Sequence, residues 1–334
     1  MKKLTIIIIV ILSVFINNFS FAADIKTKFN RAMKSFNSGN YRAAELQFKI
    51  IISENDNEFN DRARFYMARA IFYQKKFKSA IFEFNNFFHK SSTAVLQNES
   101  RYWIGESYFH LKDYVKAIGS YNRFIKKSNN TELILQSLDR IASIYYKQKR
   151  YEEAIIEWKK YIVKSKDKIK NAEAVVKIGD AYYENKSYNK AIKLLNKVIT
   201  SRVNATILAK ARITVGKIYQ KKKEHTKALK VFKSISSSYL NKPEFVEIRF
   251  FIAMTYIALN KISEAKTQLK LFIVTGKKSL YYYAAKYELG KIQLNTSEVN
   301  KGIENIKDVR TNTTDKTLRN KSLMALSKYY ININ

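Results

Sequence analysis

Small and apolar residues recur along the chain with a fixed period that predicts a repeat of paired helices. An aromatic or apolar residue is followed after three positions by a small residue and after four more by a large apolar one, as in Tyr114, Ala117 and Tyr121. Residues three and four apart lie on one face of a helix. The small residues of this motif are 36 positions apart once and then 37 apart six times: Ala44, Ala80, Ala117, Ala154, Ala191, Ala228, Ala265 and Gly302. A constant period of this size indicates a solenoid.

A second set of small residues lies twelve positions before the first set. Its members are Ala32, Ala68, Gly105, Ala142, Gly179, Gly216, Ala253 and Gly290. We therefore expect each repeat to be an antiparallel pair, helix A followed by helix B, each of about 14 residues. Small side chains let two helix backbones approach closely, while larger neighbours fill the space between pairs. Five of the eight glycines fall at these positions and are predicted to serve packing rather than turns.

Turns between the predicted helices contain almost no proline, since Pro243 is the only one in the chain. Asn, Ser, Asp and Lys fill the segments between repeats instead, at 53–61, 91–98, 128–131 and 165–171. Their side chains hydrogen-bond to nearby backbone groups, so we expect them to end helices. A last helix, about Asp315–Ile331, keeps the register of a ninth helix A without a helix B, and is predicted to cap the array.

The N-terminus has the pattern of a secretory signal peptide. Two lysines precede thirteen residues, Leu4 to Ile16, that are all apolar except Thr5 and Ser13. Small residues at Ser20 and Ala22 suit cleavage after Ala22. An uncleaved anchor is the alternative, but thirteen residues fall short of the roughly 20 that a spanning helix needs. We predict a signal peptide at residues 1–22, one solenoid domain at 23–334, and a periplasmic location after secretion across the inner membrane.

The repeats resemble the tetratricopeptide repeat over residues 25–331. The clearest one reads NESRYWIGESYF from Asn98 and DYVKA from Asp113. It is similar to repeats of the periplasmic Tol–Pal-associated cell-division coordinator and of the outer-membrane β-barrel assembly lipoprotein. The resemblance implies an all-α fold: a right-handed superhelix of about eight repeats of 37 residues, rather than the usual 34, plus a capping helix. It also implies a scaffold in envelope assembly, division or integrity. The chain has no cysteine, which argues against a lipoprotein and excludes disulfides.

No residue pattern points to catalysis. The three histidines fall in different repeats, and no nucleophile motif, phosphate-binding loop or metal-ligand spacing occurs. We expect no enzyme activity, no cofactor and no metal.

The net charge of +34, or +32 without Lys2 and Lys3, predicts attraction to an anionic membrane surface, an envelope polymer or an acidic protein. Nucleic acid is an unlikely partner for a secreted protein, and AT-biased coding is an alternative source of the lysines.

Outward-facing positions of the helices A would line the inner groove of such an array. These positions are aromatic in the first half of the chain and partly acidic in the middle, which suits a protein or peptide of the cell envelope. The predicted groove residues are Phe29, Phe36, Phe65, Phe72, Tyr73, Tyr102, Glu106, Phe109, Asp139, Tyr146, Glu173, Asp180 and Tyr183. Two alternatives stay open: some of these aromatics pack between neighbouring helices A, and the basic surface, rather than a groove, binds anionic lipid or polymer.

Overall fold

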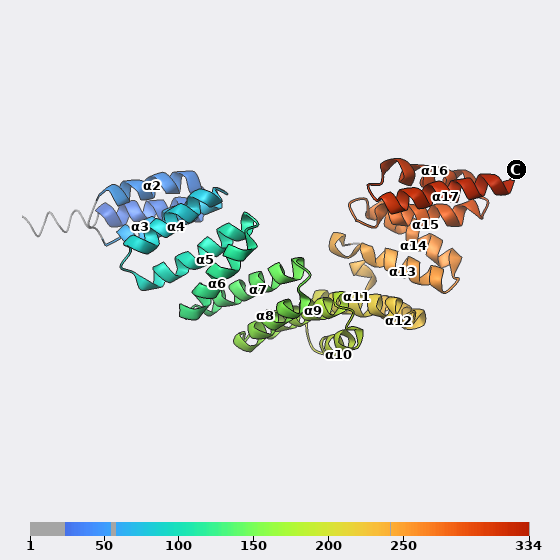
Figure 1. Ribbon diagram of the computed structural model, residues 1–334, viewed down its shortest axis with the longest axis horizontal. Coiled ribbons are helices and arrows are strands. Elements are labelled where there is room, and N and C mark those ends of the chain that lie inside the picture. Colours follow the sequence, from blue (N-terminus) through green and yellow to red (C-terminus); the bar gives the residue numbers. More distant parts are fainter. Residues whose placement is uncertain (1–23, 55–57, 241, 334) are drawn as a thin grey trace, which may run out of the picture. The chain divides into compact units, whose positions relative to one another are not determined.

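The computed structural model describes residues 24–54, 58–240 and 242–333 (Figure 1). The described chain is a succession of helices and contains no strand. Residues 24–37 form the first helix, and the others are α2 (Tyr41–Ser53), α3 (Asn60–Tyr73), α4 (Phe77–Lys90), α5 (Ala94–His110), α6 (Tyr114–Lys127), α7 (Thr131–Lys147), α8 (Tyr151–Lys164), α9 (Lys168–Glu184), α10 (Tyr188–Ile199), α11 (Ala205–Lys221), α12 (His225–Lys233), α13 (Glu247–Ala258), α14 (Ile262–Thr275), α15 (Tyr282–Leu294), α16 (Val299–Asn312) and α17 (Lys316–Ile333). The predicted signal peptide lies outside the described residues.

The described helices pair as the sequence predicts. In the first repeat, helix A is formed by residues 24–37 and helix B is α2. In the next seven repeats, helix A is an odd-numbered helix from α3 to α15, and helix B is the even-numbered helix that follows it. The helix α17 comes after the eighth pair. The helix α17 packs on α15 and α16 and buries Ser322 and Leu326, in agreement with the predicted cap. The helices A from α5 to α11 have 17 residues each, which is longer than predicted.

The small residues lie at helix crossings, which confirms their predicted role. Ala117 and Ala154 are fully buried. A Cβ atom added to Gly179 would lie 2.5 Å from Leu195, and one added to Gly216 would lie 2.4 Å from Phe232. Such distances are shorter than any ordinary carbon contact, so helices A and B approach as closely as the backbone allows.

The turn inside each of the first seven pairs uses a left-handed residue that the sequence does not reveal. Its φ is positive at Gly39, Lys75, Lys112, Lys149, Lys186, Lys223 and Asn260. In repeat three, the amide of Lys112 donates to Phe109 O at 3.0 Å and that of Asp113 donates to Tyr108 O at 3.0 Å. These two bonds are the Schellman motif, which most often has glycine at this position. Helix A therefore ends with a left-handed residue in the first seven repeats, and in five of them this residue is lysine, where glycine is usual.

The Asn and Asp residues between repeats begin the next helix instead of ending the previous one. Asn130 Oδ1 accepts from the amide of Leu133, and Asp167 Oδ1 accepts from the amides of Ile169 and Lys170. A side-chain oxygen at this position satisfies an amide in the first turn that has no partner within its helix. The prediction that these segments separate helices is confirmed. Asn130 and Asp167 cap the helix that follows, whereas the hydroxyl of Ser53 donates to Ile50 O in the last turn of α2, as predicted.

One helix B differs from the prediction. The helix α12 has nine residues, and 3-10 turns at Ser237–Tyr239 and Pro243–Phe245 follow it. Proline lacks the amide that a continuing helix needs, which suits the start of such a turn.

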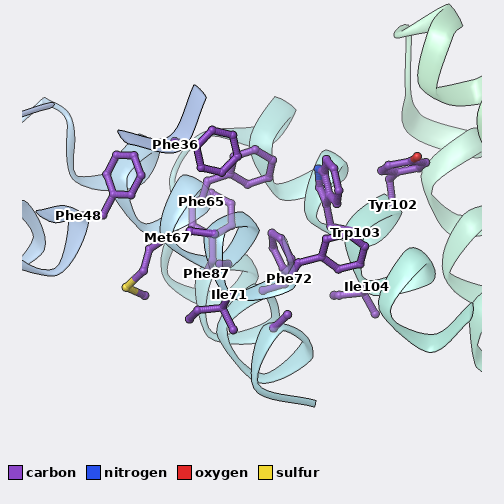
Figure 2. Close-up of a cluster of buried hydrophobic side chains, with 14 of the residues drawn as sticks. Phe36, Phe48, Phe65, Met67, Ile71, Phe72, Phe87, Tyr102, Trp103 and Ile104 are labelled. Carbon is purple, nitrogen blue, oxygen red and sulfur yellow. The ribbon is translucent and has the colours of Figure 1, made fainter. Parts of the chain in front are cut away.

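The described helices form two compact units, divided between Lys166 and Asp167. We call residues 24–166 unit 1 and residues 167–333 unit 2. The core of unit 1 is rich in aromatic rings (Figure 2). The predicted extent of a single domain, 23–334, stays a prediction.

Candidate functional site

Six of the predicted groove residues are buried. These are Phe29, Phe36, Phe65, Phe72, Tyr102 and Glu106, all in unit 1. The burial of the five aromatic rings corresponds to the alternative in which aromatics pack between neighbouring helices A. The groove role of the whole set stays a prediction. The reason is that adjacent helices A cover one another. The Phe72 ring, for example, lies 5.2 Å from the ring of Trp103 on the next helix A (Figure 2).

The side chains that do reach the surface of unit 1 rest on this aromatic core. Tyr73, at the end of α3, is 37% exposed and stacks on Tyr41 with ring centres 4.8 Å apart. Its ring also meets Trp103 at 5.7 Å. One turn earlier on α3, the half-buried Arg69 places its guanidinium carbon 4.6 Å above Trp103. Aromatic faces attract cations, so this arginine is held in place by ring faces.

Arg69 has no acidic partner among the ion pairs of the described residues. Its buried Nε atom also lacks a hydrogen-bond acceptor there. A guanidinium has five N–H donors and suits a carboxylate. Arg69 can therefore accept an acidic group from another molecule while Tyr73 contacts apolar atoms beside it.

Glu106 is a structural residue and not a free acid. The residue is 4% exposed, and its carboxylate accepts two hydrogen bonds from Arg140, at 2.9 and 3.1 Å. The hydroxyl of Tyr121 donates to Glu106 Oε1 at 2.6 Å. Burial alone would lower the pKa of Arg140, but the hydrogen bonds and the negative charge of Glu106 raise the pKa overall. Burial and the same charge raise the pKa of Tyr121 far above its usual value. Arg140 therefore stays charged and Tyr121 stays neutral at any physiological pH.

Phe109, Asp139 and Tyr146 are half-buried at the surface of unit 1. The Arg140 guanidinium lies 4.7 Å above the ring of Phe109. Asp139 accepts a hydrogen bond of 2.8 Å from Trp158 Nε1, which fixes the orientation of that acid. We call Arg69, Tyr73, Phe109 and Arg140, together with the buried Trp103 ring that contacts Arg69 and Tyr73, the helix-A surface of unit 1. It combines aromatic rings with two guanidinium groups, of which only Arg140 has a carboxylate partner.

The three remaining predicted residues belong to unit 2. Glu173 is exposed, whereas Asp180 and Tyr183 are half-buried. Burial raises the pKa of Asp180 despite a hydrogen bond from Thr214. Burial and the nearby Glu184 raise the pKa of Tyr183 to about 12. The ammonium of Lys217 lies 4.7 Å from the Tyr183 ring centre, so a cation covers this tyrosine.

Sequence reasoning left Trp103 and Arg140 out of the predicted site, although a usable signal exists. Side chains that bridge neighbouring helices A are separated by 34 residues in Glu106–Arg140, Tyr102–Gln136 and Asp180–Thr214. With a period of 37, a separation of 34 reaches the residue one turn earlier on the next helix A. Polar residues of complementary type that are 34 apart in the sequence therefore indicate side chains that hydrogen-bond to each other between neighbouring helices A.

A metal site and a membrane-spanning helix are two other features that the described residues could provide. No group of three or more His, Asp or Glu side chains is placed to hold a metal ion in this part of the chain. Between residues 24 and 333, apart from the gaps, no helix has the length and apolar character that crossing a bilayer requires.

The fold defines a class of protein, the α-solenoid built from antiparallel helix pairs. Family models for the tetratricopeptide repeat match residues 99–130, 135–162 and 173–202, which correspond to the third, fourth and fifth pairs. The chain therefore contains tetratricopeptide repeats, and its solenoid is of that type. No curated protein sequence matches the chain.

Solved structures agree on the fold. The apo form of RapI has 12% identity and a TM-score of 0.61, and the match covers 92% of this chain and 95% of that one. The C-terminal part of a tetratricopeptide protein from Cytophaga hutchinsonii has 16% identity and a TM-score of 0.54, covering 82% and 98%. A signal-transduction ATPase with a tetratricopeptide sensor from Pyrococcus horikoshii has 16% identity and a TM-score of 0.61, covering 80% of this chain and 44% of that chain. At these identities the likeness concerns the fold alone.

Proposed function

We propose that this chain is a non-catalytic scaffold that binds a protein or peptide of the cell envelope through the helix-A surface of unit 1. The observation that carries the proposal is the environment of Arg69. Its guanidinium lies over aromatic rings and has no acidic partner among the described residues, and it is next to the exposed Tyr73. Tetratricopeptide repeats commonly serve protein interaction, which supports this kind of function. The likeness to Tol–Pal-associated and β-barrel assembly repeats, stated from the sequence, supplies the envelope setting.

The proposed partner is an extended or helical segment with an acidic side chain flanked by apolar ones. Its carboxylate would take the two-pronged hydrogen bonding of Arg69, and its apolar atoms would cover Tyr73 and Phe109. Aromatic and arginine side chains are the residues that most often dominate binding energy at interfaces. The aromatic core beneath holds Tyr73 in one orientation, which reduces the entropy lost on binding.

Secretion to the periplasm is part of the proposal. It rests on the sequence of residues 1–22, with cleavage after Ala22. Osmotic shock should release a protein that begins at Ala23 without detergent. An intact Met1 found by N-terminal sequencing would contradict the proposed cleavage.

The test compares two variants of the mature protein. Tyr73→Ala with Phe109→Ala removes rings from the helix-A surface, and Phe82→Ala with Val115→Ala removes exposed apolar side chains from helices B. Partners are captured by cross-linking in cells, identified, and titrated against each purified variant after circular dichroism has shown that it is folded. We expect the first variant to lose at least tenfold in affinity and the second less than twofold. Equal effects would rule out the helix-A surface.

The second candidate function is binding of anionic envelope lipid or polymer through the basic surface. The net charge of +34 favours it. Binding of this kind should be similar for both variants and should fall steeply with salt, because the screening length drops from about 10 Å at 0.1 M to about 3 Å at 1 M. Co-sedimentation with anionic liposomes over this salt range separates it from partner binding, which should weaken less.

A further inference from the structure

A cleft of about 440 Å³ opens in unit 1 between α4, α5 and α6. It shares no residue with the helix-A surface. Its lining includes two arginines, Arg101 and Arg123, together with hydrogen-bonding groups of Asn85, His89, Tyr108 and Ser120. No acidic residue lines it.

The two arginines line the same cleft, and neither has a counter-ion among the described residues. The guanidinium of Arg101 lies 4.5 Å from the centre of the Phe88 ring and donates to Asn98 Oδ1 at 2.9 Å, so its position is fixed. Burial lowers the pKa of Arg101, and the positive charge of Arg123 lowers it further. Neither arginine forms an ion pair with any described residue. Two positive charges that line one cleft repel each other, which favours an anion between them.

Ser120, on α6, has a hydroxyl that no described group satisfies. The residue is 1% exposed, and its Oγ has no hydrogen-bond partner there. A serine within a helix commonly donates to the carbonyl four residues earlier. Ser107 and Ser137 do so, each at 2.8 Å. A buried polar atom without a partner requires an explanation, and a bound ion or water is one.

We propose that this cleft binds a phosphate monoester, with the phosphate between Arg101 and Arg123 and within reach of the Ser120 hydroxyl. A phosphate monoester carries nearly two negative charges near neutral pH and accepts hydrogen bonds from several directions. It can therefore neutralise both guanidinium groups, whereas one carboxylate can neutralise only one. Arginine is well suited to phosphate because its N–H groups form a rigid fork.

The organic part of the molecule has room beside the phosphate. The cleft is larger than a phosphate ion, and Ile104 and the ring of Tyr108 add apolar surface to its wall. The ammonium of Lys116 lies 5.4 Å from the Tyr108 ring centre and is paired with Asp113 at 3.0 Å, so the two arginines remain the cations without a partner. The ligand class is a small phosphorylated organic molecule or the phosphate headgroup of a lipid.

The first experiment titrates the full mature protein with inorganic phosphate and with glycerol 3-phosphate. Calorimetry is performed at constant ionic strength, with chloride replacing phosphate. We expect saturable binding with one site and tighter binding of the monoester. Binding that does not saturate would overturn the proposal and leave a water molecule as the partner of Ser120.

Matched variants separate the cleft from general electrostatic attraction. Arg123→Gln removes a charge from the cleft, and Arg42→Gln removes an equal charge from an exposed position on α2. We expect the first to weaken phosphate binding at least tenfold and the second less than twofold. Ser120→Ala should weaken binding about threefold or more without lowering the melting temperature. Equal losses for Arg123→Gln and Arg42→Gln would overturn the proposal.

Vesicles distinguish the two sources of the phosphate. Vesicles of phosphatidylcholine with phosphatidic acid carry a phosphate monoester, and vesicles of the same charge made with phosphatidylglycerol carry only a diester. Preference for phosphatidic acid that Arg123→Gln abolishes identifies a lipid headgroup. Binding of glycerol 3-phosphate without that preference identifies a soluble ligand. A protein that binds neither monoester contradicts the proposed site.

Discussion

Gly105 provides the most direct test of the helix crossing in repeat three. A Cβ atom at this position would lie 2.8 Å from two ring carbons of Tyr121, and ordinary contacts begin at 3.4 Å. The ring must therefore move by about 0.6 Å, the difference between these two distances. It has little freedom to move, because Tyr121 is fully buried and its hydroxyl donates to Glu106 at 2.6 Å.

The expected change in the free energy of unfolding for Gly105→Ala combines one gain and two costs. Replacing glycine with alanine inside a helix gains about 1 kcal/mol of helix propensity. Overpacking costs about 1–3 kcal/mol, and weakening a hydrogen bond to a charged group costs up to about 1.5–3 kcal/mol. We predict that Gly105→Ala lowers the free energy of unfolding by about 1–3 kcal/mol.

Gly119 is the matched control, because it lies on α6 in the same repeat and a Cβ there would meet nothing within 4 Å. Gly119→Ala should stabilise the protein by about 1 kcal/mol through helix propensity alone. Repeat arrays can unfold in parts, so the assay is native-state hydrogen exchange of α5 and α6 amides, supported by urea unfolding. Gly105→Ala should also cost less in a Tyr121→Phe background, where Glu106 no longer tethers the ring. If Gly105→Ala proves as stable as Gly119→Ala, the close crossing is wrong.

Three further predictions concern other parts of the fold. Ala154→Leu should lower the free energy of unfolding by about 1–3 kcal/mol, because Ala154 is fully buried at its crossing; an unchanged urea midpoint would contradict the repeat register. Lys112→Gly should raise the free energy of unfolding by up to about 1 kcal/mol, because it relieves the left-handed backbone at φ 62° while adding freedom to the unfolded chain; thermal melts that show destabilisation would contradict this. Burial would raise the pKa of Asp61, but hydrogen bonds from Ser91 and Thr93 lower it overall. Its contribution to stability is therefore complete above the unfolded pKa of about 3.9 and is lost as the pH falls through the lower folded value. Urea unfolding at a series of pH values should show a smaller loss for Asp61→Asn, and parallel curves would refute the assignment.

The amino-acid sequence by itself determined the repeat, the pairing of helices and the capping helix. These depend on local patterns: small residues such as Ala117 and Gly179 mark helix crossings, and a crossing of that kind tolerates little else. Because each repeat contacts only its neighbours, the same pattern returns every 37 residues and is visible without the structure. The sequence does not predict the left-handed lysines, such as Lys112, because lysine is not a residue that favours turns.

Only the tertiary structure decided which side chains remain accessible. Phe72 and Tyr73 are adjacent in sequence and both were predicted to line a groove, yet Trp103 of the next repeat buries the first and leaves the second 37% exposed. The sequence predicts Glu106 as a groove acid, but its carboxylate accepts hydrogen bonds from Arg140, 34 residues later. The cleft around Ser120 joins three helices and matches no motif. Burial and pairing of this kind depend on contacts between repeats, which the pattern within one repeat does not contain.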